Sequence, residues 1–307
     1  MSSHGLDRAV PNQAAGQLAE RTVPVSPGRR TLRRFLRHRL AVTGAIILAL
    51  LTLGAVFAPI IAPYDPNAIN LTKISQPPDR ENWLGTDRVG RDIFTRVLYG
   101  GRISLSVGFV AVGLYVAIGF VIGALAGYLG GWVDNLLMRF TEIVMCFPTF
   151  VLILILVGML GPNIGNVILV IGLFGWTGVA RLVRGQVLQL RELDFVTAAR
   201  AIGGRRWYVM VRHVTPNLVG PLTVAASLGI AGAILTEAGL SFLGLGVTQP
   251  TPSWGSILNE ARNPATLATQ PWLWLAPGAA ISLAVLAANF LGDGLRDAFD
   301  VKSRAAG

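Results

Sequence analysis

The sequence predicts an all-α membrane protein with six transmembrane helices. Of its 307 residues, 52% are hydrophobic and only 14% are charged, far below the quarter of charged residues usual in a soluble domain. A helix needs about 20 mostly apolar residues to cross a bilayer. Six segments reach this length: 40–61, 103–128, 137–160, 164–183, 220–246 and 273–292.

The positions of arginine and lysine predict the orientation, because cytoplasmic loops of membrane proteins carry the excess of these residues. With six spans and an N-terminus inside, 19 of the 26 lie on the inner side and 7 on the outer side. We therefore expect both termini in the cytoplasm. Topology explains most of the net charge of +10. Membrane lipid is an expected partner, and no basic soluble module suggests nucleic-acid binding.

The first part of the sequence predicts a cytoplasmic N-terminal arm followed by a membrane-anchoring helix. Residues 1–39 form the cytoplasmic N-terminal arm, of which 1–30 contain several prolines and few apolar residues and are expected to be flexible. Segment 40–61 follows a cluster of arginines and is too long for a removable signal peptide, so we expect a retained membrane helix.

The external segment that completes region 40–102 predicts a short helix in the outer membrane interface. Ile93, Phe94, Val97 and Leu98 recur at helical spacing. The alternative for this segment is a docking surface for an external partner.

Two local features predict how the helices meet. Gly119, Gly123 and Gly127 form a ridge of small residues in the second span, along which another helix can approach closely. In the third span, Pro148 predicts either a kink or the start of a helix. The single cysteine, Cys146, is expected to be a small core residue.

One carboxylate, Glu237, falls clearly within a span, and Glu142 lies near the inner end of the third. An ionisable residue inside a membrane marks a functional site by default, so Glu237 and the nearby Ser241 are candidates for lining or gating a pathway. The alternative is a structural role for Glu237, as a partner for Thr236 or an arginine, or a position near the outer interface.

The sequence contains no motif for catalysis or cofactor binding. A phosphate-binding Walker A loop ends in Gly-Lys-Ser/Thr, but neither Lys73 nor Lys302 follows a glycine. The three histidines lack ligand-like pairing with carboxylates or with the cysteine, so no metal site is expected. The chain is therefore not expected to be an enzyme or to hold a cofactor of its own.

The basic segment TAARAIGGRRWYVMVRHVTP, at 197–216, lies in the cytoplasmic loop 184–219. Alanines predict a first helix, Gly203 and Gly204 end it, a second helical stretch covers 205–214, and Pro216 ends that stretch before the next span. Such a hairpin fits two roles: resting on lipid headgroups, or making a rigid contact with a soluble partner.

This segment resembles the EAA loop of ABC-importer permeases, whose pattern is Glu-Ala-Ala, three residues, Gly, nine residues and Ile-x-Leu-Pro. Ala198, Ala199, Gly203 and Pro216 occupy the matching positions. The sequence departs from the pattern at three positions, with Thr197 for Glu, His213 for Ile and Thr215 for Leu.

Other strings narrow the resemblance to the DppC/OppC permeases of dipeptide and oligopeptide importers. The matching strings are WLGTDRVGRDIFTRVLYGGRISLSVG (83–108), FPTFVLILILV (147–157), TEAGLSFLGLGVTQPTPSWG (236–255) and NFLGDGLRDAFD (289–300). The resemblance implies a MetI-like permease core over 103–295, followed by a cytoplasmic tail over 296–307.

The resemblance also implies partners and a coupling site. The partners are a second, DppB/OppB-like permease, two cytoplasmic ATPase subunits that bind ATP and Mg, and an extracytoplasmic substrate-binding protein. The residues implied to couple the permease to an ATPase subunit are Thr197, Ala198, Ala199, Arg200, Ala201, Gly203 and Pro216.

The function implied by the resemblance is import of dipeptides or oligopeptides across a bacterial or archaeal cytoplasmic membrane. Nickel chelates and glutathione are the alternative substrates, since members of the same family transport them. The residues alone leave two other classes open: a self-contained, ion-coupled secondary transporter and a structural membrane scaffold.

Overall fold

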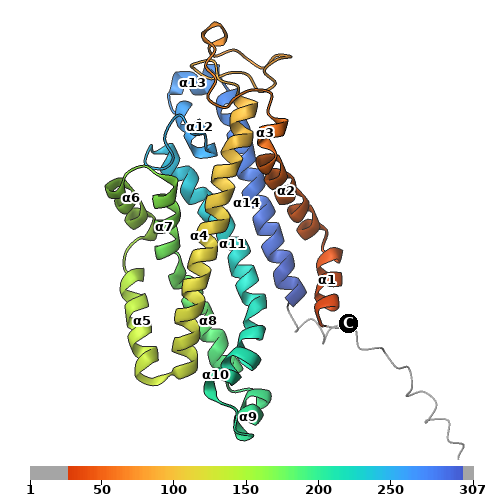
Figure 1. Ribbon diagram of the computed structural model, residues 1–307, viewed down its shortest axis with the longest axis vertical. Helices are drawn as coiled ribbons and strands as arrows, with labels where there is room; N and C mark the ends of the chain where they lie inside the picture. The colour runs from red at the N-terminus through yellow and green to blue at the C-terminus, as the bar shows by residue number, and fades with distance from the viewer. Residues whose placement is uncertain (1–26, 300–307) are drawn as a thin grey trace, which may run out of the picture.

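The computed structural model describes residues 27–299, and its regular elements are helices. Figure 1 shows an elongated bundle whose lower end carries α9 (Asp194–Ala201) and α10 (Arg206–Val209), while α1 (Pro27–Arg37) lies at the side, beside the lower end of the last helix. The upper end carries the irregular segment 62–92, α12 (Trp254–Glu260) and α13 (Pro264–Thr269). Most of the arm predicted at 1–39 and of the tail predicted at 296–307 lies outside the described residues.

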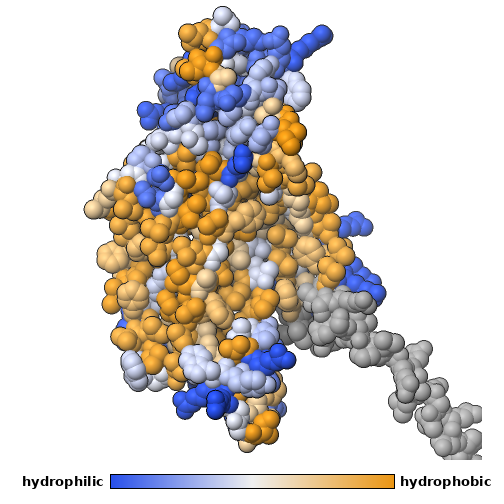
Figure 2. Space-filling view, viewed as in Figure 1, coloured by the Kyte–Doolittle hydropathy of each residue, from blue (hydrophilic) through white to orange (hydrophobic). Residues whose placement is uncertain are grey.

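Five helical stretches of the described chain are long and apolar enough to cross a membrane. They are α2 (Arg39–Val56), α4 (Ile93–Leu129), α7 with α8 (Ile164–Phe174 and Trp176–Leu190), α10 with α11 (Thr215–Phe242), and α14 (Trp272–Phe299). These stretches confirm five of the six predicted segments. Figure 2 shows the resulting band of hydrophobic surface around the middle of the bundle, with hydrophilic residues gathered at the upper end.

The sixth predicted segment is a broken pair, α5 (Gly131–Met145) and α6 (Thr149–Leu160), whose axes differ by 77°. The break confirms the effect predicted for Pro148, which is the N-cap residue of α6. Proline disfavours helical conformation in the residue before it, so α5 ends ahead of Phe147. Cys146, expected in the core, is exposed at this break.

The predicted short helix in the outer interface is wrong, because α4 continues from Ile93 to Leu129 as one helix of 37 residues. At 1.5 Å per residue it is about 55 Å long, so its first turns extend beyond a hydrocarbon layer of about 30 Å. Gly100 and Gly101 lie within it, and the backbone and ring of Trp254 pack closely over them.

Pro216 does not end a helix, which corrects a second prediction. It lies in the first turn of α11, directly after a π-helical turn and within a helical stretch that runs on from α10. A π-helical turn, Met210–Val214, joins α10 to α11, and the N–H of Thr215 donates to the carbonyl of Met210. The second helical stretch of the loop therefore continues into the next span.

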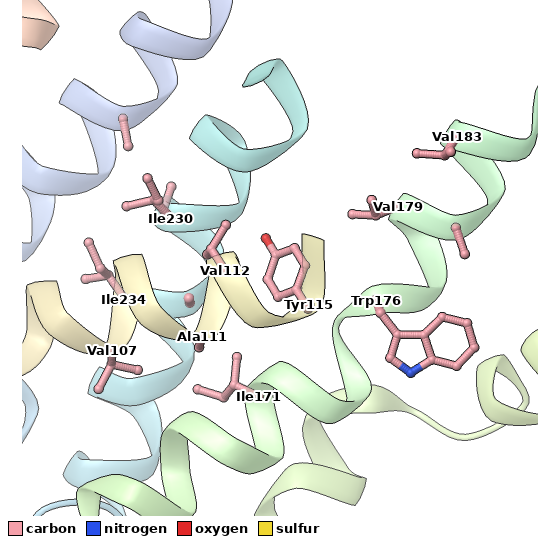
Figure 3. Packing of buried hydrophobic residues seen from close by; sticks show 14 of the residues in the cluster. Val107, Ala111, Val112, Tyr115, Ile171, Trp176, Val179, Val183, Ile230 and Ile234 are labelled. Atoms are coloured by element: carbon pink, nitrogen blue, oxygen red, sulfur yellow. The ribbon is translucent and has the colours of Figure 1, made fainter. Parts of the chain in front are cut away.

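Helix α4 lies at the centre of the bundle and packs on α7, α8 and α11. Figure 3 shows Val107, Val112 and Tyr115 of α4 beside Ile230 and Ile234 of α11. The glycine ridge of α4 packs on α8. A Cβ at Gly119 would lie 2.7 Å from Cβ of Val179 and 2.8 Å from the carbonyl oxygen of Trp176. A Cβ at Gly127 would lie 2.9 Å from the carbonyl oxygen of Arg184. A Cβ at Gly123 would overlap the carbonyl oxygen of Ala180. Only glycine permits these helices to approach so closely.

Candidate functional site

A short helical hairpin at the lower end of the bundle contains most of the residues predicted to couple to an ATPase subunit (Figure 1). It consists of α9 and α10, which contact each other. Val196 and Ala199 are the buried residues of α9, and they belong to the same core cluster as Val209 of α10. The hairpin is therefore attached to the bundle through a small apolar core.

The turn between α9 and α10 confirms the predicted glycine stop. Gly203 has a φ of +86°, a conformation that costs little for glycine and is strained for most other residues. The N–H of Gly204 donates to the carbonyl of Ala199 over 3.1 Å, which closes the end of α9. A Cβ at Gly204 would lie 2.5 Å from that oxygen, whereas one at Gly203 would meet no atom within 4 Å.

The residues predicted for coupling divide into two places. Thr197, Ala198, Arg200 and Ala201 are exposed on α9, and Gly203 is exposed in the turn. Ala199 is buried, at 8% exposure, and belongs to the hairpin core. Pro216 lies apart from them, in the first turn of α11.

Large apolar side chains surround this face, although none of them was predicted as part of the site. The most exposed is Ile202, at 88%, in the turn. We call the whole set the lower apolar surface: Leu193, Phe195, Ile202, Trp207, Tyr208 and Val211. Figure 2 shows hydrophobic atoms at this lower tip, next to hydrophilic ones. Exposed apolar surface of this kind marks a contact with another protein or with a membrane.

Arg200 connects the hairpin to the end of α4. Its guanidinium lies over the ring of Tyr128, 5.4 Å from the ring centre, in a cation–π contact. A hollow of about 360 Å³ opens here, lined by Tyr128, Leu129, Arg200, Gly204 and Arg206. This contact is a second attachment of α9 to the bundle.

Glu237 lies in the interior between α4, α11 and α12. It is fully buried and accepts hydrogen bonds from the hydroxyls of Ser104 and Ser241, both over 2.7 Å. The N–H of Trp254 donates to Ser104, and that of Val247 donates to Ser241. The carboxylate therefore joins α4 and α11 to the start of α12, a geometry that favours a structural role over direct lining of a pathway.

The expected alternative partners of Glu237 lie elsewhere. The hydroxyl of Thr236 donates to the carbonyl of Gly232, and no arginine pairs with Glu237 among the ion pairs of the described residues. Sequence reasoning missed Ser104, which is 133 residues away in the chain.

The upper end contains a cluster of buried charges. Arg96 is fully buried and lies 3.2 Å from Glu260, which Arg91 also contacts over 3.0 Å. Arg91 pairs in turn with Asp87, over 2.5 Å, and Gln249 accepts from both arginines. Burial raises the pKa of the Glu260 carboxyl above its usual range, and the charge of Arg96 opposes that rise. We call these five residues the upper charge cluster.

No three His, Cys, Asp or Glu side chains within residues 27–299 are arranged to hold a metal ion.

Comparison with known proteins places this architecture in a family. Residues 119–305 match the model of the binding-protein-dependent transport system inner membrane component, and residues 26–78 match the N-terminal transmembrane domain of oligopeptide transport permease C. A Brucella suis protein with the provisional name peptide permease protein is 45% identical over 284 residues, which cover 92% of this chain and 94% of that protein.

Two further relatives have more specific names. The dipeptide transport system permease protein DppC of Alkalihalophilus pseudofirmus is 38% identical and covers 99% of both chains. The glutathione transport system permease protein GsiD of Pectobacterium atrosepticum is 41% identical, over 91% of this chain and 93% of that protein. The chain belongs to the family of inner membrane components of binding-protein-dependent transport systems, and it is a multi-pass permease subunit of an ABC importer.

Proposed function

We propose that this chain forms half of the translocation pathway of an ATP-driven peptide importer and receives mechanical work through α9. The observation that carries the proposal is the exposed face of α9, bordered by the lower apolar surface and attached to the bundle through Val196, Ala199 and the Arg200 contact with Tyr128. A rigid, attached helix transmits a rigid-body movement, whereas a flexible loop does not.

The proposed assembly contains a second, DppB/OppB-like permease, two cytoplasmic ATPase subunits and an extracytoplasmic substrate-binding protein. The chain lacks a Gly-Lys-Ser/Thr sequence, so ATP and Mg would be bound by the ATPase subunits. The described chain ends at the same end of the bundle as α9, and segment 62–92 lies at the other (Figure 1). With the arginine excess, this arrangement supports a cytoplasmic lower end and an external upper end.

Peptides are the proposed substrates because the relatives are named for peptide, dipeptide and glutathione transport. Glutathione is itself a tripeptide, so these names agree on a chemical class. Nickel chelates remain the alternative substrate within the family pattern. A self-contained secondary transporter would need no ATPase subunit.

Reconstitution of the transporter in proteoliposomes tests the proposal. Uptake of a radiolabelled dipeptide should require ATP, both permeases, the ATPase subunits and the binding protein, and omitting any one component should reduce it to background. Uptake by this chain alone under an ion gradient would instead establish secondary transport. Uptake of a nickel chelate, with no uptake of any peptide, would change the substrate class.

A further inference from the structure

A polar hollow of about 350 Å³ lies between α5 and α8, on the faces of helices that otherwise read as membrane spans. Four of its lining residues are charged. The lining residues are Asn135, Met138, Arg139, Thr141, Glu142, Arg181 and Arg184.

The charges of this hollow lie deep along their helices. Arg181 precedes Leu190, the last residue of α8, by nine residues, and Glu142 follows Gly131, the first residue of α5, by eleven. At 1.5 Å per residue, these positions are about 13 Å from the end of α8 and about 16 Å from the start of α5, so the hollow runs along several turns of both helices.

Two of the three arginines in the hollow are paired. Arg184 makes a bidentate contact with Asp134, at 2.5 and 2.7 Å. Arg139 lies 3.0 Å from Glu142, and both side chains are exposed, at 81% and 57%. Arg181 has no carboxylate partner among the described residues, and its guanidinium lies 3.7 Å from the sulfur of Met145, next to the break between α5 and α6. The hollow therefore carries one uncompensated positive charge.

Helix α5 separates these polar residues from an apolar stripe. Asn135, Arg139 and Glu142 recur at helical spacing along the hollow, and the residues one position further along the chain, Leu136, Phe140 and Ile143, are exposed apolar side chains. Consecutive residues in a helix point about 100° apart, so the two stripes lie on different faces of α5. On the apolar face, the ring of Phe140 stacks on Trp176 of α8, with ring centres 6.0 Å apart. Charged side chains on a membrane-spanning helix face a bundle interior or water, not lipid.

We propose that the α5–α8 hollow is part of the aqueous path and that Arg181 binds a carboxylate of the passing peptide. This inference rests on the proposed function, since it assumes that peptides cross here. A peptide with a free C-terminus supplies the anion that Arg181 lacks, and a guanidinium binds a carboxylate through paired, charge-assisted hydrogen bonds. The site is transient: one cation facing water holds the substrate weakly enough to release it.

Water access to the hollow is tested by cysteine labelling of the complete transporter in proteoliposomes. The chain has one cysteine, so Cys146→Ser provides the background. A charged, membrane-impermeant thiol reagent should modify Asn135→Cys at least about tenfold faster than Leu136→Cys, because thiols react as thiolates in water. Equal rates at these adjacent exposed positions would overturn the placement of the path.

The role of Arg181 is tested by the uptake of one dipeptide with a free C-terminal carboxylate and of its C-terminal amide. The same binding protein serves every variant, so a change in the ratio of the two uptake rates, free dipeptide to amide, reports a change in the permease. Arg181→Gln should slow uptake of the free dipeptide about tenfold relative to Arg181→Lys, which keeps the charge, and reduce the ratio accordingly. ATPase activity stimulated by the loaded binding protein reports assembly.

An unchanged ratio in an Arg181→Gln transporter that assembles and hydrolyses ATP would overturn the carboxylate contact. If Arg181→Gln fails to assemble, the labelling of Asn135→Cys still decides whether the hollow is aqueous. A wild-type transporter that moves no peptide would contradict the proposed function instead, so the two failures are distinguishable.

Discussion

The two ends of the bundle differ in where their charged side chains lie: they are paired and largely buried in the upper charge cluster, and exposed on the hairpin at the lower end. At the upper end, the arginines and carboxylates of the upper charge cluster pair with one another, and Arg96 and Asp87 are fully buried. At the lower end, Ile202 is 88% exposed and Trp207 is 58% exposed. Exposed apolar side chains occur at both ends, since Leu71 and Trp83 at the upper end are 71% and 62% exposed, so the buried ion pairs are what distinguishes the upper end.

The difference predicts which substitutions affect folding and which affect coupling. Replacing a paired, buried charge should reduce the stability of the isolated chain. Replacing an exposed residue of the hairpin should leave the isolated chain intact and affect only the assembled transporter.

The largest expected effect on stability comes from Arg96→Met at the upper end. It leaves Glu260 and Asp87 with fewer partners in a buried site, and removing one member of a buried ion pair costs about 3 kcal/mol or more. The free energy of unfolding, measured by denaturant titration of the chain in detergent micelles, should fall by about this amount. Arg262→Met removes an exposed charge at the same end, and an equal loss there would contradict the comparison.

A smaller structural effect is expected within the hairpin, where its two glycines should behave differently. Gly204→Val would press a side chain against the Ala199 oxygen, and we expect a local cost of about 1 to 3 kcal/mol. Limited proteolysis should then cut the segment 200–206 faster than in the wild type. Gly203→Asn should change little, because asparagine tolerates a positive φ and the position has free space. Equal sensitivity of the two variants would show that the turn differs from the one described.

Glu237→Gln should have a still smaller effect, on transport. The amide keeps the size of the side chain and one acceptor for the hydroxyls of Ser104 and Ser241, so uptake should change less than about threefold. A larger loss, with normal assembly of the complex, would instead support the gating role predicted for this residue.

The smallest expected effect is the pH dependence of the free energy of unfolding that arises from Glu260 at the upper end. The pKa of Glu260 is raised in the folded chain, so the folded state binds a proton more readily than the unfolded state does. Lowering the pH from 7 to 5 should therefore stabilise the wild type relative to Glu260→Gln, by less than about 1 kcal/mol. The unfolding titration at both pH values measures the difference, and a relative loss of stability at pH 5 would contradict the assigned direction.

Local patterns were sufficient to predict most spans and the glycine turn. Hydrophobicity over 20 residues is a property of adjacent positions, and the break at Pro148 follows from the chemistry of that residue alone. The error at Pro216 has the same origin, because a proline after one helix and a proline in the first turn of the next look alike in a sequence.

Long-range contacts were beyond these patterns. Arg96 pairs with Glu260, 164 residues away, and no local feature distinguishes this buried arginine from an exposed one. The close packing of Gly100 and Gly101 is against Trp254, which is distant in the chain. The hollow beside Arg181 likewise forms only where α5 meets α8.

The central claim, that the exposed face of α9 is the contact with an ATPase subunit, is tested most directly by Ala198→Trp. Ala198 is exposed in α9, so a bulky side chain should fit the isolated chain but prevent close approach of a partner. Ala49→Trp places the same side chain at an exposed position of α2 and serves as the control. The measurement is ATP hydrolysis by the reconstituted transporter with its loaded binding protein. We predict that Ala198→Trp loses at least about 90% of the stimulated rate of ATP hydrolysis, because a displaced contact removes more than about 1.4 kcal/mol of coupling free energy. Its unfolding titration should match that of the wild type, and Ala49→Trp should retain activity. Normal stimulation in Ala198→Trp would contradict the account.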